Sequence, residues 1–243
     1  ISCQTGNQTR CRKAVNILSD AYGMALLRAN SNTEDKCDLK AVTITVEDVY
    51  KVAQISRLTL YTNSKGAPKF EVGKIFGLGV SGYLGSVLEI ETAVFKTKKG
   101  KGTIRFNDTA GSMAKDSVFN AMAVVRKITG EDLSNYDIHV NIIGGGQIDG
   151  PSAGMAIVAA IISAITEKPL KQDVAVTGEI SIQGLVKAVG GVFEKAYGAK
   201  QSGISTMIIP IENKNDIPEN YLGLDIRPVS KIEEALEILL AKN

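Results

Sequence analysis

The sequence predicts a mixed α/β (α+β) protein in which helices pack against small sheets, preceded by a small helical segment. From about residue 70 onward, short β-rich segments alternate with segments of helical periodicity. Before residue 60, apolar residues recur at helical spacing, and the 243 residues can bury a sizeable core. We therefore expect a helical unit at 1–60, a linker at 61–69 and an α/β domain at 70–243.

Two helices are expected in the N-terminal segment. Apolar residues recur every three or four positions over 7–29. A second helix is expected at 46–58, because Thr45 is a favourable N-cap and Asp48 follows in the first turn. The linker contains several turn-forming residues, including Asn63, Ser64, Gly66 and Pro68.

Strands and helices are interleaved in the larger part of the chain. Strands are expected at 75–80, 86–95, 103–106, 138–142, 174–177, 181–186, 206–209 and 226–229. Helices are expected at 113–129, 153–165, from Gly190-Gly191 to about 202, and 231–240. The helix at 153–165 is apolar nearly all round, so it should be buried.

Three local features of this part are also expected. The helix at 113–129 should bury an apolar face that includes Phe119. The lysine-rich stretch at 96–101 should be the solvated tip of a hairpin between the second and third strands. Ser230 and Glu233 should form a capping box before the last helix.

Charge and hydropathy argue against two classes of partner. The 28 basic and 26 acidic side chains give a net charge of +2, which argues against nucleic acid or an anionic membrane as the main partner. No apolar run reaches the roughly 20 residues that a membrane helix needs, and no signal peptide is visible. We therefore expect no membrane segment and a cytoplasmic location.

Metal sites and disulfides are not expected. The three cysteines, Cys3, Cys11 and Cys37, show no C-x-x-C spacing and are remote from the single histidine, His139. Free cytosolic thiols are therefore expected rather than disulfides or zinc ligands. A Ser-His-Asp triad would have to use His139.

The most informative stretch is D-G-P-S-A-G at 149–154, where a glycine-rich loop enters the apolar helix. Ser152 is thereby placed at the positive end of a helix, where free backbone N–H groups can hold a developing oxyanion. Gly150 and Gly154 permit close approach of another backbone or of a substrate. Taken alone, this local pattern is more typical of an ordinary helix N-cap.

A nucleophilic serine needs a base, and the candidates are His139 and the lysines. A lysine can serve only if burial or a positive field lowers its pKa. Lys195 falls in the first turn of the helix after Gly190-Gly191, where the helix dipole disfavours positive charge. Lys187, the competitor, ends a strand and has no such field. An isolated lysine is usually a solvated surface charge, so this pattern alone does not select the base.

Three motifs, taken in order, resemble the signature of Lon proteases. They are D-G-P-S-A-G at 149–154, T-G-E-I at 177–180 and G-G-V-F-E-K at 190–195. The resemblance covers about residues 70–242 and implies a Lon-type proteolytic domain. In that family the serine and the last lysine of these motifs form a Ser-Lys dyad, which implies catalytic roles for Ser152 and Lys195.

The resemblance also implies supporting residues beside the dyad. Thr177 matches a threonine near the catalytic lysine and is expected either to orient Lys195 or simply to end a strand. Asp149 matches a position that influences whether the site is open, with turn capping as the alternative, and Gly150 belongs to the same motif. His139 matches a family histidine outside the dyad and is expected on a strand near the site.

The N-terminal segment is similar to the small helical subdomain that ends AAA+ ATPase modules, and the pattern resembles the archaeal and sporulation-type Lon branch. No G-x-x-x-x-G-K-[ST] phosphate loop occurs in the chain. We therefore expect no cofactor here, with ATP and Mg²⁺ only in an absent upstream ATPase domain. Either the chain is part of a longer ATP-dependent protein, which we expect because it begins with Ile1, or the natural chain has lost ATP dependence.

The resemblance implies a serine endopeptidase that cleaves unfolded or damaged polypeptides through an acyl-enzyme. It further implies a homo-oligomer in the form of a hexameric ring. The alternative is a non-catalytic Lon-like ring or scaffold domain. Such domains usually lack the dyad, whereas this chain has both members.

Overall fold

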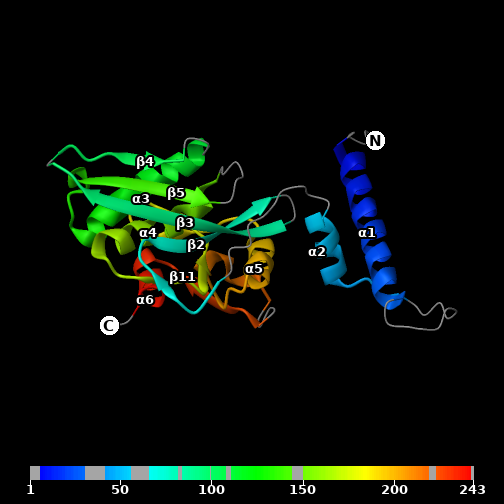
Figure 1. Cartoon of the computed structure of the whole chain (residues 1–243). Helices are drawn as coiled ribbons and strands as arrows, with labels where there is room; N and C mark the ends of the chain where they lie inside the picture. Colours follow the sequence, from blue (N-terminus) through cyan, green and yellow to red (C-terminus); the bar gives the residue numbers. More distant parts are fainter. Residues whose placement is uncertain are drawn as a thin grey trace. The chain divides into compact units, whose positions relative to one another are not determined.

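The computed structural model describes residues 6–30, 42–55, 66–81, 84–98, 100–107, 111–143, 150–218 and 223–241. Parts of the expected segments lie outside these ranges, namely 56–58 of the second helix, 61–65 of the linker and 144–149 of the glycine-rich loop. The chain divides into two compact units, 1–61 and 62–243. Figure 1 draws the first unit in blue and the second in cyan to red.

In the described part of the first unit, the chain forms α1 (Gly6–Asn30) and α2 (Val46–Ile55), as the apolar spacing predicts. Thr45 and Asp48 close the start of α2, because the Asp48 carboxylate accepts hydrogen bonds from the N–H and Oγ1 of Thr45 at 2.9 and 2.8 Å. Arg28 of α1 pairs with the same carboxylate at 3.0 Å. The Thr45 hydrogen bonds, aided by Arg28, hold the pKa of Asp48 below its usual value.

A seven-stranded mixed sheet organises the second unit, in the order β11-β10-β7-β2-β3-β5-β4. Its strands are β2 (Lys74–Ser81), β3 (Leu84–Lys96), β4 (Ile104–Phe106), β5 (Tyr136–Ile143), β7 (Val174–Val176), β10 (Thr206–Pro210) and β11 (Asp225–Val229). Strands β2, β3 and β5 pair antiparallel, whereas β7, β10 and β11 continue from β2 in parallel. Figure 1 shows β3, β5 and β4 side by side.

Two short sheets accompany the main one. Strand β1 (Phe70–Glu71) pairs with β6 (Leu170–Lys171), and β8 (Glu179–Ile180) pairs with β9 (Val186–Lys187). Three short 3₁₀ segments among the described residues, η1 (Leu133–Asn135), η2 (Pro151–Ala153) and η3 (Ile211–Asp216), connect the larger elements. Segments η2 and η3 both bear on the candidate site.

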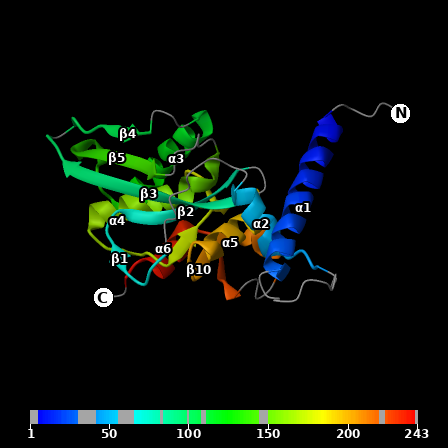
Figure 2. The same cartoon turned by 45° about the vertical axis from the view of Figure 1, so that its right-hand side comes forward.

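Helices cover both faces of the sheet. One apolar core includes α3 (Ser112–Thr129), α4 (Gly154–Thr166) and α6 (Ile232–Leu239), and a second includes α5 (Val192–Gln201). Successive side chains of β2 point to opposite faces of the sheet, so Ile75 belongs to the first core and Phe76 to the second. Helix α5 lies against β2 and β3 (Figure 2).

The strongest periodic patterns are confirmed. In α4, residues 154–163 are all buried, as expected for a helix that is apolar nearly all round. In β5, Ile138, Val140 and Ile142 are buried and alternate with more exposed positions. These two elements lead into and out of the glycine-rich stretch that carries Ser152.

Two predictions about strand arrangement are wrong. Strand β5 lies between β3 and β4, so the lysine-rich stretch at 96–101 is not the tip of a hairpin. Thr103 anchors the start of β4 beside β5, because the Asp137 carboxylate accepts from its N–H and Oγ1 at 2.9 and 2.7 Å. Residues 181–185, expected within a strand, form the turn between β8 and β9, where Gly184 has a φ of 88°.

Two predictions about helices are also wrong, one about a buried face and one about a cap. Phe119 is 76% exposed, because the buried stripe of α3 runs through Val118, Met122 and Val125 and leaves Phe119 one position off it. The N–H of Ser230 donates to the Glu234 carboxylate at 2.8 Å instead of pairing with Glu233. The cap therefore involves a different carboxylate from the expected one.

Candidate active site

Ser152 lies in η2, directly before the buried helix α4. Two backbone hydrogen bonds fasten this corner to Gly178, from the Gly178 N–H to the Ser152 carbonyl at 2.9 Å and from the Met155 N–H to the Gly178 carbonyl at 3.1 Å. Gly154 is required there, because a Cβ would lie 2.9 Å from the Ile180 side chain and 3.0 Å from its backbone nitrogen. The nucleophile candidate therefore sits on a rigid helix start.

Lys195 lies near the start of α5 and is almost fully buried, with 3% of its surface exposed. Its Nζ donates to Thr177 Oγ1 at 3.1 Å. Burial lowers the pKa of Lys195 to about 8, and the neighbouring Glu194 opposes the shift. The sequence singled out this lysine for a lowered pKa on the ground of the helix dipole, and the structure adds desolvation by burial as a cause.

Close backbone contact with β3 fixes the position of α5. A Cβ on Gly85 of β3 would lie 1.8 Å from the Glu194 carbonyl oxygen, and one on Gly198 would lie 2.4 Å from the Gly85 backbone. Before α5, Gly191 adopts a left-handed conformation with φ of 67° and packs against Val80. These glycines let the helix that carries Lys195 approach the sheet at backbone distance.

Ser152 and Lys195, which are 43 positions apart in the sequence, line one pocket of about 310 Å³. The other lining residues are Val80, Pro151, Ala188, Val189 and Gly190. The pocket thus combines the serine, a buried amine of lowered pKa, and five other residues without polar side chains. Such an arrangement can support nucleophilic catalysis by serine with lysine as proton acceptor.

Thr177 follows β7 and is fully buried. Its N–H donates to the Ile208 carbonyl at 3.1 Å, so the residue is tied to β10, while its Oγ1 accepts from Lys195. Of the two alternatives left open by the sequence, a strand end and a partner of Lys195, the structure shows both features in one residue. Asp149, another expected supporting residue, lies outside the described residues.

Gly150, an expected supporting residue, and Lys187, the rival base, do not line this pocket. Gly150 has extended backbone, with φ of 166° and ψ of 154°, and a Cβ there would meet nothing within 4 Å. Lys187, the rival base, is exposed and pairs with Glu212 at 3.2 Å. Lys187 therefore behaves as the solvated surface charge that an isolated lysine usually is.

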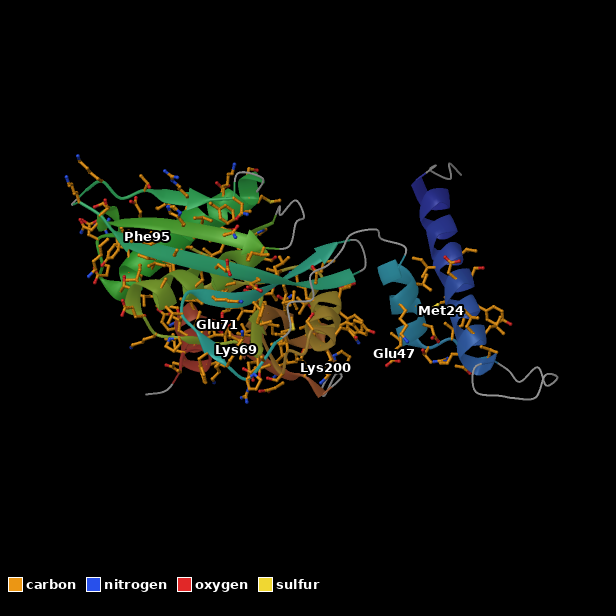
Figure 3. All side chains as sticks on the ribbon, in the orientation of Figure 1. Met24, Glu47, Lys69, Glu71, Phe95 and Lys200 are labelled. Atoms are coloured by element: carbon orange, nitrogen blue, oxygen red, sulfur yellow. The ribbon has the colours of Figure 1, made fainter. Side chains whose placement is uncertain are left out.

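His139 does not line the pocket. It lies opposite Ala93 of β3, and its ring meets the edge of Phe95 with centroids 6.0 Å apart. Figure 3 shows Phe95 at the far end of the sheet from Lys200 of α5. Since Gly85 of β3 touches α5, Ala93 lies about 26 Å further along the strand. The expectation that His139 lies near the site is therefore wrong.

Sequence reasoning missed two residues that shape the pocket. Glu212 accepts a 3.0 Å hydrogen bond from the Ala188 N–H. The Asn213 carboxamide accepts from the Val189 N–H and donates to the Val189 carbonyl, both at 3.0 Å. The P-I-E-N stretch at 210–213 carries no role that local spacing alone reveals.

Metal ligation and membrane spanning are not indicated in the part of the chain that the structure describes. No group of three or more His, Cys, Asp or Glu residues there is placed to hold a metal ion. None of the helices in the same ranges is long and apolar enough to cross a membrane. Cys3 and Cys37 lie outside the described residues.

Comparison with protein families identifies one match over most of the chain. The family model of the Lon protease (S16) C-terminal proteolytic domain matches residues 44–242. The match therefore begins before the α/β domain expected from residue 70 and includes α2.

Curated relatives carry the same name. Lon protease 2 of Bacillus subtilis is 41% identical over 94% of the chain and 42% of its own length. Lon protease of Escherichia coli is 40% identical over 70% of the chain and 23% of its own length. The archaeal Lon protease of Pyrococcus abyssi is 38% identical over 71% of the chain and 18% of its own length. The chain thus spans less than half the length of these relatives.

Proposed function

The chain belongs to the Lon protease family, and on this premise we propose that it is a serine endopeptidase with Ser152 as nucleophile and Lys195 as general base. One observation carries the proposal. A buried lysine amine with a pKa of about 8 lines the same pocket as a serine at the start of a helix. A lysine of ordinary pKa would stay protonated near neutral pH and could not accept the serine proton.

Acylation follows from these two groups. The neutral Nζ of Lys195 takes the hydroxyl proton as Ser152 Oγ attacks the carbonyl carbon of the scissile peptide. The resulting ammonium then gives that proton to the leaving amine nitrogen as the C–N bond breaks. An ester between Ser152 and the N-terminal part of the substrate remains, and the base is neutral again.

Deacylation repeats the sequence with water. Lys195 takes a proton from water, the hydroxyl oxygen attacks the ester carbon, and the proton returns to Ser152 Oγ as the ester bond breaks. The released product carries a carboxyl group. No cofactor takes part in either half of this mechanism.

The helix start supplies the electrostatic part of the mechanism. The first N–H groups of a helix lack intrahelical partners and carry partial positive charge. Ser152 and Ala153 lie at this end of η2 and α4, where such groups can hold the oxyanion of each tetrahedral intermediate. The anchoring to Gly178 keeps this corner fixed during the reaction.

If the domain were only a structural scaffold, the burial of Lys195 would have no physical explanation. Burying an amine costs free energy, and an apolar side chain of similar length would fill the space better. Strongly shifted pKa values that accompany a pocket are typical of functional sites. The burial of Lys195 beside Thr177 therefore supports catalysis over the non-catalytic alternative.

The wider activity is proposed from the family. We propose unfolded or damaged polypeptides as substrates, a hexameric ring as the assembly, and coupling to an ATPase domain that precedes this chain in a longer protein. We also propose that an extended substrate binds by pairing with a strand edge of the domain. A cytoplasmic location stays a prediction.

The experiment that tests the proposal is covalent labelling of the chain with a fluorophosphonate probe, followed by peptide mapping. We expect the probe on Ser152, no labelling of the Ser152→Ala variant, and normal labelling of Ser163→Ala, which removes a buried serine of α4, the helix that follows Ser152. The same preparations are assayed on a fluorogenic peptide. Undiminished cleavage by Ser152→Ala would refute the assignment.

A further inference from the structure

The pocket wall made by residues 188–190 is held in an unusual way. Strand β9 ends at Lys187, and the two backbone N–H groups that follow donate to side chains of η3. Glu212 receives the N–H of Ala188, and Asn213 receives that of Val189. This wall thus depends on two side chains from a segment 24 residues further along the chain.

Asn213 makes the more demanding of these contacts. Its carboxamide pairs with both the N–H and the carbonyl of Val189, as a neighbouring strand would. Its Nδ2 also donates to Asp216 at 2.6 Å, and only 6% of the residue is exposed. A flipped carboxamide would direct its oxygen at the Asp216 carboxylate and the Val189 carbonyl, so the network fixes the orientation.

Loss of this carboxamide would leave both polar groups of the Val189 backbone without their partner. Such groups must then find water or another partner, which requires the segment to move. The side chain of Lys195 is held by its own burial and by its hydrogen bond to Thr177, neither of which involves Asn213. Loss of the Asn213 contact therefore acts first on the wall.

We infer that Asn213 is a positioning residue for substrate, which acts by holding the pocket wall at 188–190 in the shape that a bound peptide meets. The inference rests on the proposed peptidase function. It predicts that Asn213 governs the binding of extended peptides and leaves the reactivity of Ser152 toward small reagents unchanged. A side chain that only stabilised the fold would lower the melting temperature on removal and leave KM unchanged.

Three variants test the inference in peptide-cleavage kinetics. Asn213→Ala removes the carboxamide, and Asn213→Asp keeps its size but cannot donate to the Val189 carbonyl when ionised. Gln172→Ala is the matched control, because it removes another buried carboxamide, which donates to the carbonyls of Lys74 and Leu170 and lines no part of the pocket.

We expect both Asn213 variants to raise KM for a fluorogenic peptide about tenfold, with kcat changed less than threefold. Their rate of Ser152 labelling by a fluorophosphonate should equal that of the unaltered chain, which also shows that they are folded. Gln172→Ala should lower the melting temperature without altering KM.

An unchanged KM in Asn213→Asp would show that the shape of the side chain suffices and would overturn the inference. An equal rise of KM in Gln172→Ala would overturn it too, since any loss of stability would then have the same effect. Failure of the proposed function is distinguishable, because the unaltered chain would then show neither cleavage nor labelling at Ser152.

Discussion

The Nζ of Lys195 donates a 3.1 Å hydrogen bond to Oγ1 of Thr177, inside a region where both residues are buried. Thr177 is tied through its backbone to β10, and Lys195 is carried by α5, which packs against β3. This hydrogen bond thus links two separately anchored elements, and one of them carries a lysine that lines the pocket. Its role can be tested directly.

Replacement of Thr177 by valine should lower kcat about tenfold and shift the pH–activity midpoint to lower pH. The oxygen of Thr177 stabilises the ammonium form of Lys195 more than the neutral amine, so its loss lowers the pKa of Lys195 further. The value of kcat at high pH falls because the Lys195 amine is no longer oriented by its hydrogen-bond partner. Thr177→Ser, which keeps the oxygen, should retain most activity in the same pH–rate measurement. A midpoint that moves upward would contradict this account.

Peptidase activity should rise with pH around a midpoint near 8. Lys195 must be neutral to accept a proton, and its pKa is lowered to about 8 by burial. At pH 6 the amine is almost fully protonated and activity should be low, whereas at pH 9 it should approach a plateau. The measurement is kcat/KM from pH 6 to 9.5 at constant ionic strength. A flat profile over this range would exclude a lysine base with this pKa.

Only one of the two candidate lysines should matter for catalysis. Lys195→Met should lower kcat/KM at least about a hundredfold, because it removes the general base while filling the buried space. Lys187→Met should keep most activity, since Lys187 makes one exposed ion pair with Glu212. The two variants are compared on one fluorogenic peptide. Loss of activity in Lys187→Met alone would move the base to that residue.

Lys195→Met should also make the domain more stable at neutral pH. The unfolded chain binds the proton of this lysine up to pH about 10.5, and the folded chain only up to about 8. At pH 7 the burial of the charged amine therefore costs about 3 kcal/mol, and the cost shrinks as pH rises from 8 toward 10.5. Denaturant unfolding of the unaltered chain and of Lys195→Met should show a difference in unfolding free energy at pH 7 that falls to about half by pH 9.5. If the difference in unfolding free energy instead grew with pH, the pKa of Lys195 would not be lowered in the folded chain.

Gly198→Ala should destabilise the domain by about 1–3 kcal/mol and reduce activity. The new Cβ would lie 2.4 Å from the Gly85 backbone, so α5 must move away from β3 and carry Lys195 with it. Gly23→Ala in α1 is the matched helix substitution, because nothing lies within 4 Å of its Cβ. That change should stabilise its helix by up to about 1 kcal/mol. Thermal unfolding and peptide cleavage of the two variants check the contrast.

The sequence alone determined the elements with strong periodicity and the family. The buried helix α4, the alternating strand β5 and the break at Gly190-Gly191 before α5 all follow from local spacing, because side-chain direction repeats every 3.6 or two residues. The ordered motifs around Ser152 and Lys195 indicated the family, and the family match bears this out.

Only the tertiary structure decided what surrounds those residues. It placed β5 between β3 and β4, exposed Phe119 and set His139 away from the pocket. It also showed that burial lowers the pKa of Lys195 and that Asn213 holds the pocket wall. Strand order, desolvation and side-chain bridges depend on contacts between residues far apart in the chain, and local spacing carries no record of such contacts.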